Sequence, residues 1–169
     1  MPLSIQPTQP PQSPQLPIAP LWRRLTALIY DTLLVVALFI LTAFINLGIQ
    51  LVYYGEPHLK QLTEDGHTLD NGGLYLALVA VTYAFFTYCW CRKGQTPGMK
   101  AWRVRLVTTQ MQPVTLKSAT IRWLAAIPSL LLCFAGTLWM VVDPQAKSWQ
   151  DRASKTMIVV LPNLGACRN

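Results

Sequence analysis

The sequence predicts an all-α membrane protein, a small helical bundle with a short cytoplasmic element of two β-strands. Apolar residues make up 52% of the 169-residue chain and charged residues only 12%, about half the share found in a typical soluble domain. The apolar residues gather in three long runs, and the basic residues lie in the connections between them. We therefore interpret the excess of basic residues, a formal charge of +7, as a signal for the orientation of the chain in the membrane. We expect no nucleic-acid partner, because the sequence holds no basic helix or aromatic-basic platform.

The three apolar runs cover residues of about 25–52, 74–91 and 121–142. A helix that crosses a bilayer needs roughly 17–25 apolar residues, so the first two runs are predicted to be transmembrane helices. Pro128 lies inside the third run and should kink or break its helix. The third run is therefore predicted either to cross the membrane or to form a re-entrant or interfacial pair of short helices.

The charges of the connections predict the orientation. Residues 53–73 carry four acidic residues against Lys60, whereas residues 92–118 carry six basic residues and no acidic one. Arg23 and Arg24 precede the first run. Because basic connections stay in the cytoplasm, we expect a cytoplasmic N-terminus and a cytoplasmic loop at 92–118, with the lipid bilayer as the main partner.

Two short segments have the composition of β-strands. Residues 102–109 alternate large apolar and polar side chains, and residues 156–161 are rich in β-branched residues. They can pair only if both lie on one side of the membrane. Trp123 and Trp139 are 16 residues apart, a helical distance of roughly 24 Å that suits two opposite membrane interfaces and favours a third crossing. The basic tail after the third run favours a cytoplasmic C-terminus instead. We predict a cytoplasmic C-terminus and a paired ribbon.

The ends of the chain are expected to lie outside the membrane domain. Residues 1–20 hold seven prolines and no charge, which predicts a disordered, extended tail. The membrane domain is expected over residues 21–161, and residues 162–169 form a C-terminal tail.

Asp31 is the most unusual residue of the first run. On a helix that begins near Leu25, its neighbours on the same face are all apolar: Ala27, Leu28, Leu34 and Val35. A carboxylate in such a place has an abnormal proton affinity or needs a cation from another segment. Arg122, at the start of the third run, is the expected partner. The pattern leaves two interpretations open, an ion or proton site and a structural charge pair that fixes helix packing.

Small residues recur at every fourth position of the third run, at Ala125, Ser129, Cys133 and Thr137. Such a stripe lets membrane helices approach closely. We expect it to face another helix, either in the same chain, in a homo-oligomer or in another membrane protein.

No motif predicts catalysis, a metal or a cofactor. Cys89 and Cys91 form a C-x-C pair, but a second pair at zinc-site spacing is lacking. His58 and His67 share a connection with four acidic residues, a composition more typical of a solvated loop than of a metal site. The sequence also lacks a hydrolase elbow, a Walker loop and a Gly-rich dinucleotide turn. We therefore expect a protein that is not an enzyme.

Three stretches together resemble the RDD family of bacterial membrane proteins. They are Arg23-Arg24-Leu25 leading to Asp31, the turn at 94–100 followed by Trp102-Arg-Val-Arg-Leu-Val, and Ser148-Trp-Gln-Asp-Arg with Thr156. The resemblance runs from about residue 21 to residue 161. It places the family arginine on Arg24 (or Arg23) and the two aspartates on Asp31 and Asp151. Pro97, before Gly98, departs from the commoner pattern and should only stiffen the turn.

The resemblance implies a multi-pass protein of the bacterial inner membrane, and transport, including cation exchange, has been proposed for members of the family. One hypothesis is a transporter or a cation or proton exchange component that uses Asp31, with Arg24 and Asp151 gating the cytoplasmic end. Arg122 and Arg152 complete the expected ion site or structural charge network. The alternative is a non-transporting accessory or assembly protein that acts through helix packing and the basic loop.

Overall fold

A computed structural model describes residues 16–65, 72–132, 135–141, 143 and 147–162. The elements follow in the order α1 (Leu21–Glu64), α2 (Gly72–Lys93), α3 (Pro97–Ala101), β1 (Val104–Thr108), α4 (Leu116–Leu131), α5 (Ala135–Leu138), η1 (Trp139–Val141), α6 (Trp149–Ser154) and β2 (Thr156–Val160). The described part of the chain is mostly helical, as the sequence predicted.

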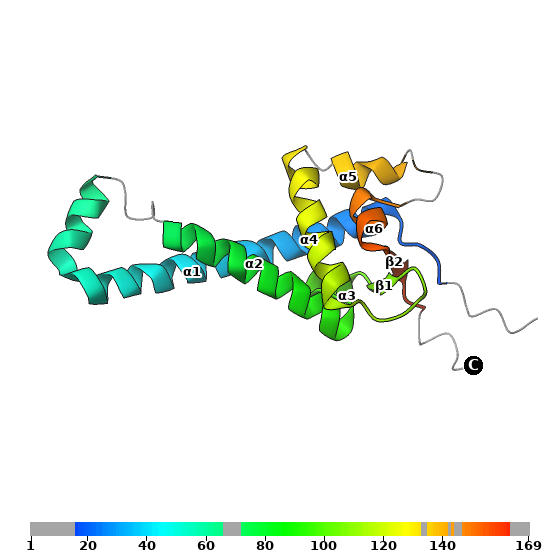
Figure 1. Cartoon of the computed structure of the whole chain (residues 1–169), viewed down its shortest axis with the longest axis horizontal. Helices are drawn as coiled ribbons and strands as arrows, with labels where there is room; N and C mark the ends of the chain where they lie inside the picture. The colour runs from blue at the N-terminus through cyan, green and yellow to red at the C-terminus, as the bar shows by residue number, and fades with distance from the viewer. Residues whose placement is uncertain (1–15, 66–71, 133–134, 142, 144–146, 163–169) are drawn as a thin grey trace, which may run out of the picture.

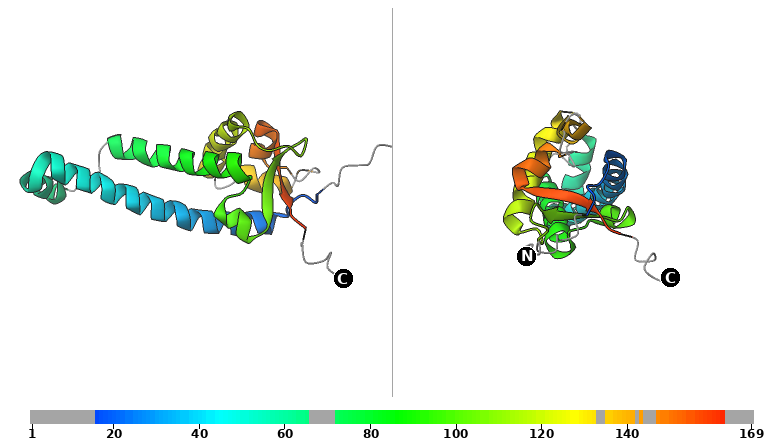
Figure 2. Two further views of the ribbon diagram at one scale, coloured as in Figure 1. Left: turned by 90° about the horizontal axis from the view of Figure 1, so that it is seen from below. Right: turned by 90° about the vertical axis from the view of Figure 1, so that its right-hand side faces the viewer.

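Two long helices run side by side along the longest axis of the molecule (Figures 1 and 2). In the described residues, Leu21–Pro57 of α1 and Gly72–Lys93 of α2 are long and apolar enough to cross a membrane. The most apolar stretch of α1 is not buried within the chain at all, so a protein core does not account for its composition. These helices confirm the first two predicted segments as candidate spans.

Gly55 interrupts α1 near its far end. Its φ of 77° lies in the left-handed region, which glycine adopts without the steric cost of a side chain. Pro57 follows two residues later, in the first turn of the last helical stretch, where its missing N–H costs no hydrogen bond. The last turns of α1 therefore bend away from the long axis, as Figure 1 shows.

The two predicted strands pair as expected. Strands β1 and β2 are antiparallel, with a register that runs from Val104 opposite Val160 to Thr108 opposite Thr156. Residue Ile18 bridges Val159 on the outer edge of β2. The expected tail boundary at residue 20 is therefore too late, because 17–19 form backbone hydrogen bonds with β2; residues 1–15 and 163–169 lie outside the described residues.

A small apolar core lies where the helices meet the sheet, and we call this region the sheet end. It comprises the start of α1, the end of α2, α3, α4, α6 and both strands. The buried core residues come from all parts of the chain: Ala19, Ala27, Trp90, Met99, Val104, Leu106, Val114, Ala119 and Ile158. The bridge at residue 18 and the final strand place both ends of the described chain at the sheet end.

The third apolar run does not form one helix. Pro128 was expected to kink or break the helix; it does not break it, since α4 continues through Pro128 to Leu131. A proline removes one hydrogen bond, to the carbonyl four residues earlier, and one turn later α4 ends. The run then continues as α5 and η1. Helix α4 lies crosswise to α1 and α2 in all three views (Figures 1 and 2).

Candidate functional site: two buried carboxylates at the sheet end

The carboxylate of Asp31 is held by the turn between α2 and α3. The Thr96 hydroxyl donates a hydrogen bond to Oδ2, and the Gly98 N–H donates to Oδ1 over 2.9 Å. Thr96 is also the N-cap of α3, where its hydroxyl accepts a hydrogen bond from the Met99 N–H. Asp31 is buried, with 5% of its surface exposed, and both of its oxygens have partners.

Gly98 allows this close approach between α1 and the turn. A Cβ on Gly98 would lie 2.3 Å from the Ala27 carbonyl oxygen and 2.8 Å from Asp31 Oδ1. No side chain fits at those distances. Residues 94–100, which the sequence indicated only as a turn, therefore bind a carboxylate. The threonine N-cap followed by proline at the first helical position is the local signal that could have revealed it.

Asp151 is the centre of the second arrangement. Its Oδ2 accepts a hydrogen bond from Arg24 Nη1 and its Oδ1 accepts one from Arg122 Nη1, each over 2.6 Å. Asp151 Oδ2 also accepts from the N–H of Ser148, whose hydroxyl accepts in turn from the N–H of Asp151, a capping box at the start of α6. One buried carboxylate therefore ties together α1, α4 and α6.

The charges in this cluster favour the ionised form of Asp151. Burial by itself opposes ionisation, but the adjacent Arg122 and Arg24 guanidinium groups outweigh it and lower the pKa of Asp151 from 3.8 to about 2. The carboxylate is 1% exposed and the two arginines are 7% exposed. Asp151 therefore stays charged, and it does not exchange protons near neutral pH.

The predicted pair of Asp31 with Arg122 is wrong. Arg122 instead contacts Asp151, donates to Thr156 Oγ1 over 2.9 Å, and places its guanidinium carbon 5.6 Å from the centre of the Trp90 ring. The reason is that the turn after α2 supplies Asp31 with uncharged donors, while Arg122 lies on the face of α4 that packs against α6. Arg24, which was expected to act with Asp151 at the cytoplasmic end, forms an ion pair with the Asp151 carboxylate.

Arg152, the fifth predicted residue, lies outside this cluster. It donates to Asp143 over 2.7 Å, and its side chain is 54% exposed. The structure therefore divides the predicted charges into a carboxylate held by uncharged donors, a buried cluster of three charges and a peripheral ion pair.

The small-residue stripe packs partly within the chain. Ser129 is buried, and a Cβ on Gly136 would lie 2.6 Å from the Ser129 hydroxyl oxygen. The stripe thus lets α4 and α5 approach closely. Cys133, the third residue of the stripe, lies outside the described residues.

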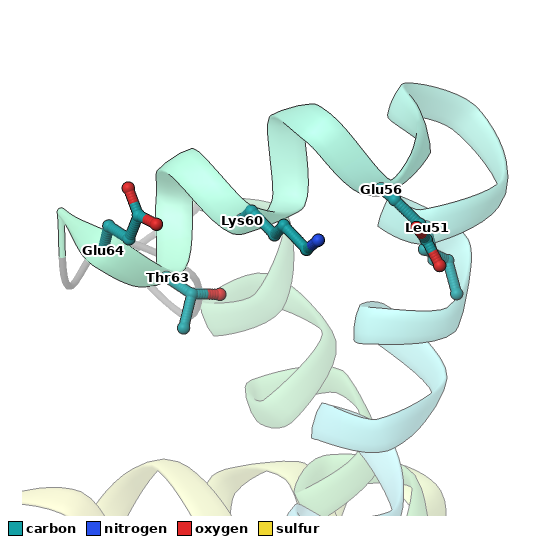
Figure 3. A pocket seen from close by; sticks show the side chains of 5 residues that line it. All are labelled: Leu51, Glu56, Lys60, Thr63 and Glu64. Atoms are coloured by element: carbon teal, nitrogen blue, oxygen red, sulfur yellow. The ribbon is translucent and has the colours of Figure 1, made fainter.

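Groups of three or more metal-binding side chains are not found in the described part of the chain. Cys89 and Cys91 are half-buried free thiols there, whereas His67, Cys167 and the side chain of His58 lie outside the description. Figure 3 shows an open hollow at the opposite end of the molecule, into which Lys60 points. It is lined by Leu51, Glu56, Lys60, Thr63 and Glu64, and it includes none of the predicted charges.

Comparison with protein families gives a match over most of the chain. The family model described as the RDD family matches residues 18–155, which is most of the chain. Curated proteins and solved structures gave no match.

Proposed function

Because this chain belongs to the RDD family and its apolar helices indicate an integral membrane protein, we propose that it is a multi-pass, non-transporting accessory or assembly protein of the bacterial inner membrane. Its buried charges hold the sheet end together, and its apolar helices contact other membrane proteins or further copies of the chain. The observation that carries this proposal is the use of both buried carboxylates as internal connections between elements.

Asp151 supports the structural role most directly. Its carboxylate is neutralised by two arginines from different helices and is closed off from solvent. A carboxylate that moves ions must change its protonation or its partners during each cycle. The low pKa of Asp151 and its hydrogen bonds with Arg24, Arg122 and Ser148 oppose such a change.

The orientation proposed for the chain follows the charges. Arg23, Arg92, Lys93 and Lys100 lie at or next to the sheet end, whereas Glu56 and Glu64 lie on the last turns of α1, at its far end. We therefore place the sheet end in the cytoplasm, because basic segments stay on the cytoplasmic side of the membrane. The shared position of residue 18 and β2 supports a C-terminus on the same side as the N-terminus.

Asp31 favours a second candidate function, cation or proton exchange. Among the described residues its hydrogen-bond donors are the Thr96 hydroxyl and the Gly98 N–H, which carry no formal charge. Its charge is therefore not neutralised in the way that the charge of Asp151 is. In this candidate function, Asp31 binds the exchanged ion and the Arg24–Asp151 contact gates the cytoplasmic end.

A flux measurement distinguishes the two functions. The wild-type protein, Asp31→Asn and Glu64→Gln are reconstituted in liposomes that contain a pH-sensitive dye, and cation gradients are applied. The accessory function predicts the flux of protein-free liposomes for all three. Glu64 is an exposed carboxylate and serves as the matched control. Flux in the wild type and in Glu64→Gln that disappears in Asp31→Asn would refute the accessory function and establish ion exchange.

A further inference from the structure

One face of α4 is apolar and exposed. The residues Leu116, Leu124, Ile127, Leu130 and Leu131 are 43–78% exposed, and they recur at intervals of three, four and eight along the helix, which places them on one side. We call them the α4 stripe. A set of five large apolar side chains on one helix face is more than scattered surface residues and marks a contact surface.

The contacts of α4 show which way the stripe faces. Thr120 and Trp123, which lie on the same side of the helix as the stripe, contact Tyr83 of α2: the two hydroxyl oxygens are 2.8 Å apart and the ring centres 5.5 Å apart. Arg122, on the opposite side, contacts Trp90. Tyr83 lies about two turns further from the sheet end than Trp90. The stripe therefore faces away from the sheet, in the direction in which α1 and α2 extend.

The opposite face of α4 has a different chemistry. Arg122 binds Asp151 and Ser129 packs against Gly136, so the polar and small residues face α6 and α5. Helix α4 is thus amphipathic. Its polar side faces α5 and α6, and its apolar side faces α1 and α2. This division is typical of helices that lie at a membrane surface.

From this arrangement we propose that α4 lies in the plane of the membrane and inserts its stripe into the acyl chains of one phospholipid leaflet. Two observations identify the occupant as lipid. On the side of α2 that carries Tyr83, the residue that α4 contacts, the apolar side chains Leu76 and Val79 are 72% and 52% exposed. Helix α4 also runs crosswise to α1 and α2 (Figure 1). With 16 residues it is about 24 Å long, whereas the hydrocarbon core measures about 30 Å.

The inference rests on the membrane placement in the proposed function, but not on the accessory role. It resolves the alternatives left by the sequence, because an in-plane α4 means that the third apolar run does not cross through this helix. The cytoplasmic leaflet is then the one that receives the stripe.

Depth measurements test the inference. Single cysteines replace Leu116, Ile127 or Leu131 in a chain whose native cysteines are changed to alanine, and each is labelled with bimane. The variants are reconstituted in phosphatidylcholine vesicles, and quenching by lipids brominated at different depths gives the depth of each label. Ile29 and Ile40 of α1, 60% and 54% exposed, form the control pair with the same eleven-residue separation as Leu116 and Ile127.

An in-plane helix predicts similar, shallow depths for all three α4 labels. The control pair should differ by up to about 16 Å, because each residue of a spanning helix adds about 1.5 Å. A difference between Leu116 and Ile127 as large as that of the control pair would overturn the proposal. So would quenching of the α4 labels by aqueous iodide alone, or protection from both quenchers, which would indicate a protein partner. Equal depths for the control pair would instead overturn the membrane placement of α1, on which the inference rests.

Discussion

The charge cluster around Asp151 makes a strong prediction for the variant Asp151→Asn. The substitution keeps the size of the side chain but removes the negative charge between Arg24 and Arg122, which are both 2.6 Å from it. Removing one partner of a buried ion pair costs about 3–5 kcal/mol, because an uncompensated charge stays buried. Here two arginines lose their counter-charge, so we expect a loss at the upper end of this range.

The free energy of unfolding can be measured in mixed micelles by titration with SDS, with circular dichroism as the readout of helix content. The matched control is Arg152→Gln, which removes an ion pair whose arginine is 54% exposed. An exposed pair contributes about 0–1 kcal/mol, so this control should remain close to the wild type. Both variants remove one charge near the same short helix, α6.

Coupling between the partners separates a charge effect from general damage. With Asp151 already changed to asparagine, replacing Arg24 by methionine removes a buried charge that has lost its partner. The double variant should therefore lose less stability than the sum of the single losses, by about 0.5–3 kcal/mol. A loss below about 1 kcal/mol for Asp151→Asn, or strictly additive losses, would refute a buried charge cluster that holds the sheet end together.

Three further predictions concern the same end of the molecule. Because its pKa is lowered from 3.8 to about 2, Asp151 contributes roughly 2 kcal/mol of stability above pH 3.8. An acid titration of the unfolding free energy should show the loss of this contribution as the pH falls from 3.8 toward 2, because the unfolded chain takes up the proton first. Gly98→Ala should cost about 1–3 kcal/mol in the same assay, since its Cβ would overlap the α1 backbone, whereas Gly48→Ala, with no atom within 4 Å, should not destabilise. Ser129→Leu should likewise cost about 1–3 kcal/mol by overpacking against Gly136; an unchanged midpoint would contradict that contact.

Much of the fold follows from local sequence patterns. Long apolar runs predict α1 and α2, and alternation over residues 102–109 predicts β1. The pairing of β1 with β2 could be predicted only from the membrane topology, because the two segments must lie on the same side of the membrane. The participation of residues 17–19 was not predictable, since their contribution is backbone hydrogen bonding and the prolines around them indicate an extended tail.

The charges were predicted as residues but not as partners. Arg24 and Asp151 were expected only at the same end of the molecule, and the structure joins them in an ion pair. The partner of Asp31 was missed because a search for a counter-charge overlooks hydroxyl and backbone N–H donors, which depend on the conformation of a turn. The absence of a break at Pro128 has a related reason: a helix that packs against two others tolerates one missing hydrogen bond, and tertiary contacts decide where it ends.

The positions of the two carboxylate sites define how the first helix is held. Arg24 and Asp31 are seven residues apart, about two turns, and therefore lie on nearly the same face of α1. One contacts α6 through Asp151, and the other contacts the turn before α3. Both connections lie in the first three turns of a helix whose most apolar stretch is not buried in the chain. Changes in the first turns should therefore alter folding, whereas the exposed stretch beyond Asp31 remains available to lipid or to a partner without disturbing the sheet end.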